Sequence, residues 1–209
     1  MPQTVSRRFV LTVAAAAAAA TMPAVTMPAR AAEPAAELIS STATEVIEAM
    51  KRTPPGPERA AVMERVLETK FDLPGMGQFA LGQYWSRITP QQQAQFLKAA
   101  ESAEARAYSD RFGQYAGQSL QVGRVTTRGG KYYVESTINQ SGGGQPIKLE
   151  WEVKNTPNGL RISDIKVEGV SMIQTRRADF TSYVQSHGGD VNALTNELQA
   201  RATAAAAAR

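Results

Sequence analysis

Cysteine is absent from this sequence, and histidine occurs once, at His187. Without cysteine the chain has no disulfide, no thiol nucleophile and no thiolate metal ligand. One histidine makes a zinc site a poor fit, because such sites draw most of their ligands from cysteine and histidine. His187 also directly precedes Gly188-Gly189, a pair typical of a helix C-terminus. We therefore expect no metal and no other cofactor.

Long apolar runs are scarce as well. The longest, Val10 to Ala20, is too short for a membrane span, which needs about 20 residues. It follows a twin-arginine pattern in Ser6–Leu11 and is followed by Ala29-Arg30-Ala31, the small residues that signal peptidase requires. We predict that residues 1–31 are a cleaved twin-arginine signal peptide. The alternative is an uncleaved membrane anchor.

The net charge is small once the predicted signal peptide, residues 1–31, is left out. The formal net charge is +4, and the predicted signal holds Arg7, Arg8 and Arg30 with no acidic residue before Glu33, which leaves +1 for the mature chain. Such a balance is weak evidence for a nucleic-acid partner, and we expect none. The Ser141–Gly144 run is predicted to be a hairpin turn and not a phosphate loop, because no Gly-Lys-Ser/Thr follows it.

The first half of the mature chain has apolar residues at helical spacing. Breaks at Pro54-Pro55 and at Leu73-Pro74 divide it, and Thr89-Pro90 reads as an N-cap followed by proline at the first helical position. The predicted helices here are one around Leu38 to Met50, a second over Pro57 to Phe71, a short third through Tyr84, and a long fourth from Pro90 to Phe112.

Beyond this region the apolar period falls to two, which favours strands. Glycine-containing turns separate four runs, and two further helices follow. We predict one α+β domain over residues 32–201, a four-stranded antiparallel meander with helices packed on one face, and a disordered alanine-rich tail over residues 202–209. The predicted strands are Ser119 to Thr127, Lys131 to Gln140, Ile147 to Val153 and Leu160 to Val167, and the later helices are Met172 to Ser186 and Asp190 to Ala200.

Three short motifs carry a family resemblance: Val167–Met172 (VEGVSM), Arg177 to Phe180 (RADF) and His187–Gly189 (HGG). In this order they resemble the periplasmic phospholipid carriers of the MlaC type, also described as toluene-tolerance auxiliary proteins. The similarity runs from about Leu38 to Leu198. Many members have Asn-Tyr where this chain has Thr175-Arg176, so the subfamily stays open, and the hopanoid-associated HpnM branch is an alternative.

The resemblance implies a non-enzymatic, monomeric periplasmic shuttle. Such proteins carry a diacyl phospholipid between an outer-membrane lipoprotein complex and an inner-membrane ABC lipid transporter. The acyl chains enter a deep apolar pocket between helices and sheet, and the head group stays near solvent. Enclosure is needed, because roughly 30 methylenes at about 0.8 kcal/mol each would cost on the order of 24 kcal/mol in water.

Large apolar side chains are the candidates for lining this pocket, although all of them would also suit an ordinary core. They are Phe79, Tyr84, Phe96, Tyr108, Tyr132, Leu149, Trp151, Val170, Ile173 and Phe180. Arg177 is the head-group candidate, because a guanidinium binds phosphate in a bidentate manner. The alternatives for Arg176-Arg177 are a structural ion pair with Asp179 or Glu168, and simple solvation.

Two other classes of protein are alternatives. A small-molecule dehydratase or isomerase needs an acid–base pair inside its pocket. The nearest pair is Asp164 and Glu168, and strand alternation predicts that both point to solvent. An assembly factor that only docks a partner is the other class, and it would have a closed core without a lipid-sized void.

Overall fold

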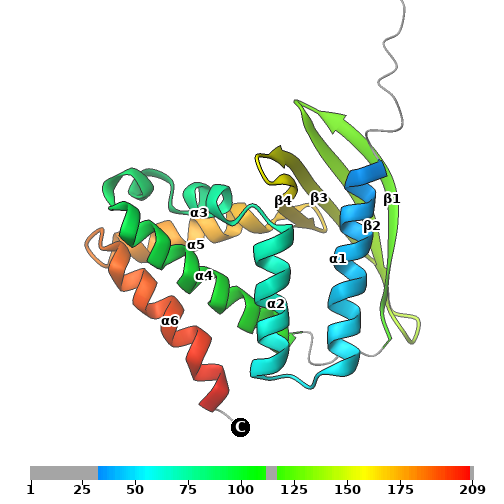
Figure 1. The fold of residues 1–209 in the computed structure, drawn as a ribbon, viewed down its shortest axis with the longest axis horizontal. Helices are drawn as coiled ribbons and strands as arrows, with labels where there is room; N and C mark the ends of the chain where they lie inside the picture. The colour runs from blue at the N-terminus through cyan, green and yellow to red at the C-terminus, as the bar shows by residue number, and fades with distance from the viewer. Residues whose placement is uncertain (1–32, 112–116, 208–209) are drawn as a thin grey trace, which may run out of the picture.

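The computed structural model describes residues 33–111 and 117–207 (Figure 1). The predicted signal peptide and the last two residues of the predicted tail lie outside this part of the chain and stay predictions. None of the helices in the described part is long and apolar enough to cross a membrane. The helices are α1 Glu33–Arg52, α2 Pro57–Lys70, α3 Leu73–Leu81, the 3-10 helix η2 Gly82–Arg87, α4 Pro90–Arg111, α5 Met172–Ser186 and α6 Val191–Ala207.

One antiparallel sheet follows α4, with its strands in sequence order. The α+β class is confirmed, but the prediction of four strands is wrong, because the sheet has five. The fifth strand is short because it pairs only two residues with the end of the fourth, across a tight turn at Glu168-Gly169. The strands are β1 Ser119–Arg128, β2 Lys131–Asn139, β3 Ile147–Thr156, β4 Gly159–Val167 and β5 Val170–Ser171.

The turn between β4 and β5 has positive φ at both central residues, 48° at Glu168 and 83° at Gly169. This is the signature of a type I′ hairpin, which suits the twist of two paired strands. The Glu168 side chain compensates its unfavourable backbone region by accepting a hydrogen bond from the Lys148 amide at 2.6 Å. The chain therefore reverses direction between β4 and α5.

The sheet has one apolar and one charged face. Val134, Val153 and Ile162 are fully buried on the apolar face, where Ala35 and Ile39 of α1 pack against them. The other face carries ion pairs between strands, at 2.7 Å for Lys131–Glu152 and for Lys166–Glu150 and 3.1 Å for Arg128–Glu150. Figure 1 shows α1 beside the sheet and α2 beside α1, with α4 and α6 packed together farther from β1.

A β-bulge at Ser163 changes which residues of β4 face the helices. Glu152 pairs with Asp164 and Val153 with Ile162, so Ser163 is an extra residue that shifts the alternation. Both Ile162 before the bulge and Ile165 after it join the apolar cluster. Asp164 is 7% exposed. The expectation that Asp164 points to solvent is therefore wrong, because its carboxylate is covered by the start of α5, to which it is hydrogen-bonded.

The buried Asp164 carboxylate holds the start of α5. Its Oδ2 accepts a hydrogen bond from the Ser171 hydroxyl at 2.6 Å, and its Oδ1 accepts one from the Ile173 amide at 3.1 Å. Ser171 Oγ in turn accepts from the Gln174 amide at 3.2 Å, as an N-cap does. The sheet and the C-terminal helices are thus joined through one carboxylate.

A second apolar cluster holds the helices together away from the sheet. Phe96 of α4 and Phe180 of α5 meet edge to face, with ring centroids 5.8 Å apart. Leu194 and Leu198 of α6 are buried in the same cluster. α6 continues to Ala207, into the segment for which we predicted a disordered tail, and alanine has the highest helix propensity of all residues.

We expect Ser171→Ala to lower the free energy of unfolding by about 2 kcal/mol, because it removes the N-cap of α5 and leaves a buried Asp164 oxygen without its donor. Urea denaturation measures the change. Thr89→Ala is the matched control, since Thr89 caps α4 in a solvent-exposed capping box with Gln92 and should cost about 1 kcal/mol or less. Equal losses in the two variants would contradict the role given to Asp164.

Candidate functional site

One cavity, the larger of a neighbouring pair, lies between α1, α2 and one end of the sheet. Its volume is about 430 Å³, within the range of about 300–1,000 Å³ of pockets that hold small molecules. Apolar side chains form most of its wall. It is lined by Thr42, Ala43, Val46, Ile47 and Met50 of α1, Met63, Val66, Leu67 and Phe71 from α2 and its C-cap, Tyr108, Gln118, Ser119, Leu120, Ile138, Gln140, Ile147, Leu149, Trp151, Ile165, Val167 and Met172.

The cavity exists because α1 packs on the sheet along only part of its length. Ala35 and Ile39, near its start, are completely buried. Val46, Ile47 and Met50, farther along the same helix, keep partial exposure although they are apolar, because they face the cavity. The C-terminal half of α1 therefore stands away from the sheet and leaves an apolar space.

Two polar side chains in the wall of this cavity are hydrogen-bonded to the protein. The Trp151 indole N–H donates to the Ser136 hydroxyl at 2.8 Å, and the Thr42 hydroxyl donates to the Leu38 carbonyl at 2.6 Å. Buried polar groups that are already paired do not demand water or a polar ligand. The interior of the larger cavity therefore suits an apolar ligand.

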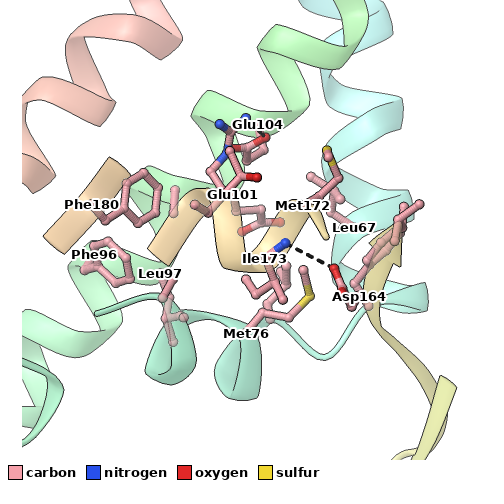
Figure 2. A pocket seen from close by; sticks show the side chains of 18 of the residues that line it. Leu67, Met76, Phe96, Leu97, Glu101, Glu104, Asp164, Met172, Ile173 and Phe180 are labelled. Carbon is pink, nitrogen blue, oxygen red and sulfur yellow. Dashed lines mark hydrogen bonds and ion pairs between the residues drawn. The ribbon is translucent and has the colours of Figure 1, made fainter. Parts of the chain in front are cut away.

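A smaller cavity of about 120 Å³ lies among α3, α4 and α5 (Figure 2). Its walls differ from side to side. Figure 2 shows Phe96, Leu97 and Phe180 on one side, Asp164 on the opposite side, and Glu101 and Glu104 along a third. The remaining lining residues are Leu67, Phe71, Leu73, Met76, Gly77, Ala80, Ala100, Tyr108, Ile165, Met172, Ile173, Thr175 and Arg176.

The charged side of the smaller cavity is an ion pair between Arg176 of α5 and Glu104 of α4. Arg176 Nε donates to Glu104 Oε1, its Nη2 donates to Oε2 at 3.0 Å, and its Nη1 lies 3.5 Å from Asp179 Oδ2. Hydrogen bonding to Glu104 raises the pKa of Arg176 despite its partial burial. One partner named from the sequence, Asp179, is present, but the principal partner is Glu104.

The predicted lining residues fall into four groups. Leu149 and Trp151 line the larger cavity, Phe96, Ile173 and Phe180 line the smaller one, and Tyr108 lines both. The others line neither. Tyr84 is buried in the helical cluster, and Tyr132 lies on the apolar face of the sheet. Phe79 and Val170 lie on the surface, where they are 41% and 57% exposed.

Arg177, the predicted head-group contact, also lies outside both cavities. Its Nη1 donates to the Phe79 carbonyl at 3.1 Å, and its guanidinium carbon is 4.9 Å from the centre of the Phe79 ring. Gly82 leaves room for it, since a Cβ there would approach Nη2 to 3.0 Å. Arg177 thus binds the last turn of α3, and contact with a lipid head group stays a prediction.

Sequence reasoning did not single out the residues of α1 and α2 that form one whole wall of the larger cavity. Val46, Ile47 and Met50 belong to the helix predicted around Leu38 to Met50, but that helix also includes the fully buried Ile39. Spacing distinguishes the inner face of a helix from its outer face. It does not distinguish an inner face that packs from one that borders a void.

Comparison with known proteins connects this geometry to a family. A family model described as MlaC protein matches residues 40–200. The fold is similar to that of a phospholipid-binding protein from Ralstonia solanacearum, solved in complex with a phospholipid. The two chains are 23% identical, with a TM-score of 0.69, and the match covers 82% of this chain and 98% of that one. The resemblance seen in the sequence motifs is confirmed.

We expect Arg176→Gln to reduce the free energy of unfolding by about 1–2 kcal/mol, because it leaves the half-buried Glu104 carboxylate without its partner. Arg177→Gln is the control and should cost less, since it removes one hydrogen bond to a carbonyl at an exposed position. Thermal or urea unfolding of both variants measures the difference. A larger loss for Arg177→Gln would show that the ion pair with Glu104 is not the stabilising one.

Proposed function

This chain belongs to the MlaC family, and from that premise we propose that it binds a phospholipid in the larger cavity and carries it through the periplasm. The observation that carries the proposal is an apolar cavity of about 430 Å³ between α1, α2 and the sheet. Binding is non-covalent and reversible. The acyl chains occupy the space between α1, α2 and the sheet, and the head group stays near solvent.

Energetics favour this assignment of the larger cavity. Each acyl methylene moved out of water contributes roughly 0.8 kcal/mol, so enclosure of the chains is the main requirement of a carrier. Leu149 and Trp151 on the sheet, with Val46 and Met50 on α1, offer apolar surface from both sides of the space. The lipid-bound state of the Ralstonia solanacearum protein, which has the same fold, is consistent with this use.

Family membership also supports a role in transport between membranes. We infer that the chain is exported by its N-terminal signal and works in the periplasm as a monomer. Its partners would be an outer-membrane lipoprotein complex, and an inner-membrane ABC transporter that supplies the energy for net movement. A hopanoid cargo is the alternative within the family, and analysis of the bound lipid distinguishes the two.

The competing classes fit the structure less well. A pure assembly factor would have a closed core, which the larger cavity argues against. For an enzyme, the candidate acid–base pair is Asp164 and Glu168. Asp164 uses both oxygens to hold the start of α5, and Glu168 is exposed on a turn, where it binds the Lys148 amide. Both groups serve the fold.

We expect Leu149→Asp to abolish lipid carriage, because it places a carboxylate in the apolar wall of the larger cavity, where burial of a charge is unfavourable. The measurement is the amount of phospholipid that is extracted from the purified protein. Thr137→Asp is the matched control, since Thr137 lies on the charged face of the sheet opposite Lys148. Normal lipid content in a folded Leu149→Asp variant would remove Leu149 from the binding surface.

Fluorescence gives an independent test that needs no loss of function. Phospholipid with brominated acyl chains should quench Trp151, which lines the larger cavity, and leave Trp85 of η2 largely unquenched, since Trp85 lines neither cavity. Trp151→Phe should therefore remove most of the quenching, and Trp85→Phe should keep it. Quenching that survives in Trp151→Phe and disappears in Trp85→Phe would place the chains elsewhere.

A further inference from the structure

The two cavities are separated by a single layer of side chains. A group of residues lines both of them, so each of these side chains has one surface in either space. The two cavities are therefore neighbours that share part of their walls. The shared residues are Leu67, Phe71, Tyr108, Ile165 and Met172.

Met172 is the member of this layer best suited to move. Its side chain is unbranched, rotates about three bonds and adapts to irregular spaces at little cost. Its backbone is fixed, because Ser171 before it and the Ile173 amide after it are both bonded to Asp164. Figure 2 shows Met172 beside Leu67, on the opposite side of the smaller cavity from Phe96 and Phe180. A mobile side chain on a fixed backbone can open a passage without disturbing the fold.

The far end of the smaller cavity is apolar. Ala80, Phe96 and Phe180 there are 2%, 0% and 6% exposed. Its volume of about 120 Å³ is slightly below the roughly 150 Å³ of an apolar cavity that binds benzene, so it has room for about four or five carbon atoms. A space of this volume holds the last few carbon atoms of an acyl chain.

The charged groups beside this space are already engaged. Arg176 is bonded to Glu104, and Glu101 lies 3.2 Å from Lys98. Asp164 is bonded within the cap of α5. A lipid head group would have to break these pairs to bind there, whereas an acyl chain would leave them intact.

We propose that the smaller cavity receives the methyl end of one acyl chain, which enters from the larger cavity past Met172, and that its depth sets the longest chain the protein accommodates. This inference rests on the proposed function. It assigns the selection of acyl-chain length to residues of α3, α4 and α5 around the smaller cavity.

The test is to fill the smaller cavity. Ala100→Leu adds three carbon atoms from α4, and Ala94→Leu, an exposed position on the same helix that lines neither cavity, is the matched control. Delipidated protein is offered vesicles that contain dilauroyl and dipalmitoyl phosphatidylglycerol in equal amounts. The ratio of the two lipids in the recovered protein is measured by mass spectrometry.

The long-to-short ratio should fall in Ala100→Leu by roughly fourfold for each methylene excluded, and on the order of tenfold or more in total, while Ala94→Leu matches the unmodified protein. An unchanged ratio in folded Ala100→Leu overturns the inference. A second set of vesicles, with dipalmitoyl phosphatidylglycerol and dipalmitoyl phosphatidylethanolamine in equal amounts, tests the head group. A changed head-group preference at constant chain preference also overturns the inference, because it would assign the space to a head group. If circular dichroism shows that Ala100→Leu does not fold, Leu97→Phe fills the same cavity and should give the same shift.

Failure of the underlying function gives a different result. If the unmodified protein takes up neither lipid, the carrier proposal itself is wrong, and the chain-length inference falls with it. If it takes up both lipids and Ala100→Leu changes nothing, only the inference about the smaller cavity is wrong.

Discussion

The attachment of α5 to β4 through the Asp164 carboxylate is the interaction on which the rest of the structure depends. It joins the sheet to the C-terminal helices, fixes the backbone on either side of Met172 and holds one end of the wall between the two cavities. A parallel bridge between Phe71 and Ile162 and an ion pair between Asp72 and Lys154 at 2.5 Å attach the end of α2 to the same region of the sheet. The walls of both cavities are therefore attached to the sheet at several points.

A cavity of this kind has a thermodynamic cost that a ligand offsets. Space between apolar walls forfeits the contacts that close packing would give, and core cavities lower stability by roughly 24 cal/mol for each Å³. A lipid that binds only the folded protein restores those contacts and adds stability in proportion to its concentration relative to its dissociation constant. Interactions away from the cavities stabilise the fold. They include the packing around Phe96 and Phe180 and the ion pairs on the outer face of the sheet.

Much of the fold could be predicted from the sequence because it is encoded locally. Helical spacing, the Thr89-Pro90 cap and the glycine turns gave the order of helices and strands. The bulge at Ser163 was not visible, since one extra residue in β4 leaves no compositional mark. The burial of Asp164 was not visible either, because it comes with hydrogen bonds to the start of α5. The strand Val170–Ser171 was missed for a related reason, because two residues are too few to show a period.

The site was less accessible to sequence reasoning than the fold. Core and cavity wall need the same residue types, so Tyr84 and Trp151 looked alike, yet one is packed among helices and the other faces the larger cavity. Ion pairs between distant segments were equally hidden. Arg176 binds Glu104, 72 positions earlier in the chain, and no local pattern connects them.

Native mass spectrometry of the mature protein isolated from the periplasm, followed by extraction and identification of its lipid, tests the central claim most directly. The account predicts about one phospholipid for each chain, released when the protein is denatured. A chain that is empty on isolation, and that also takes up no lipid from phospholipid vesicles, would contradict the assignment of the larger cavity as a lipid-binding site.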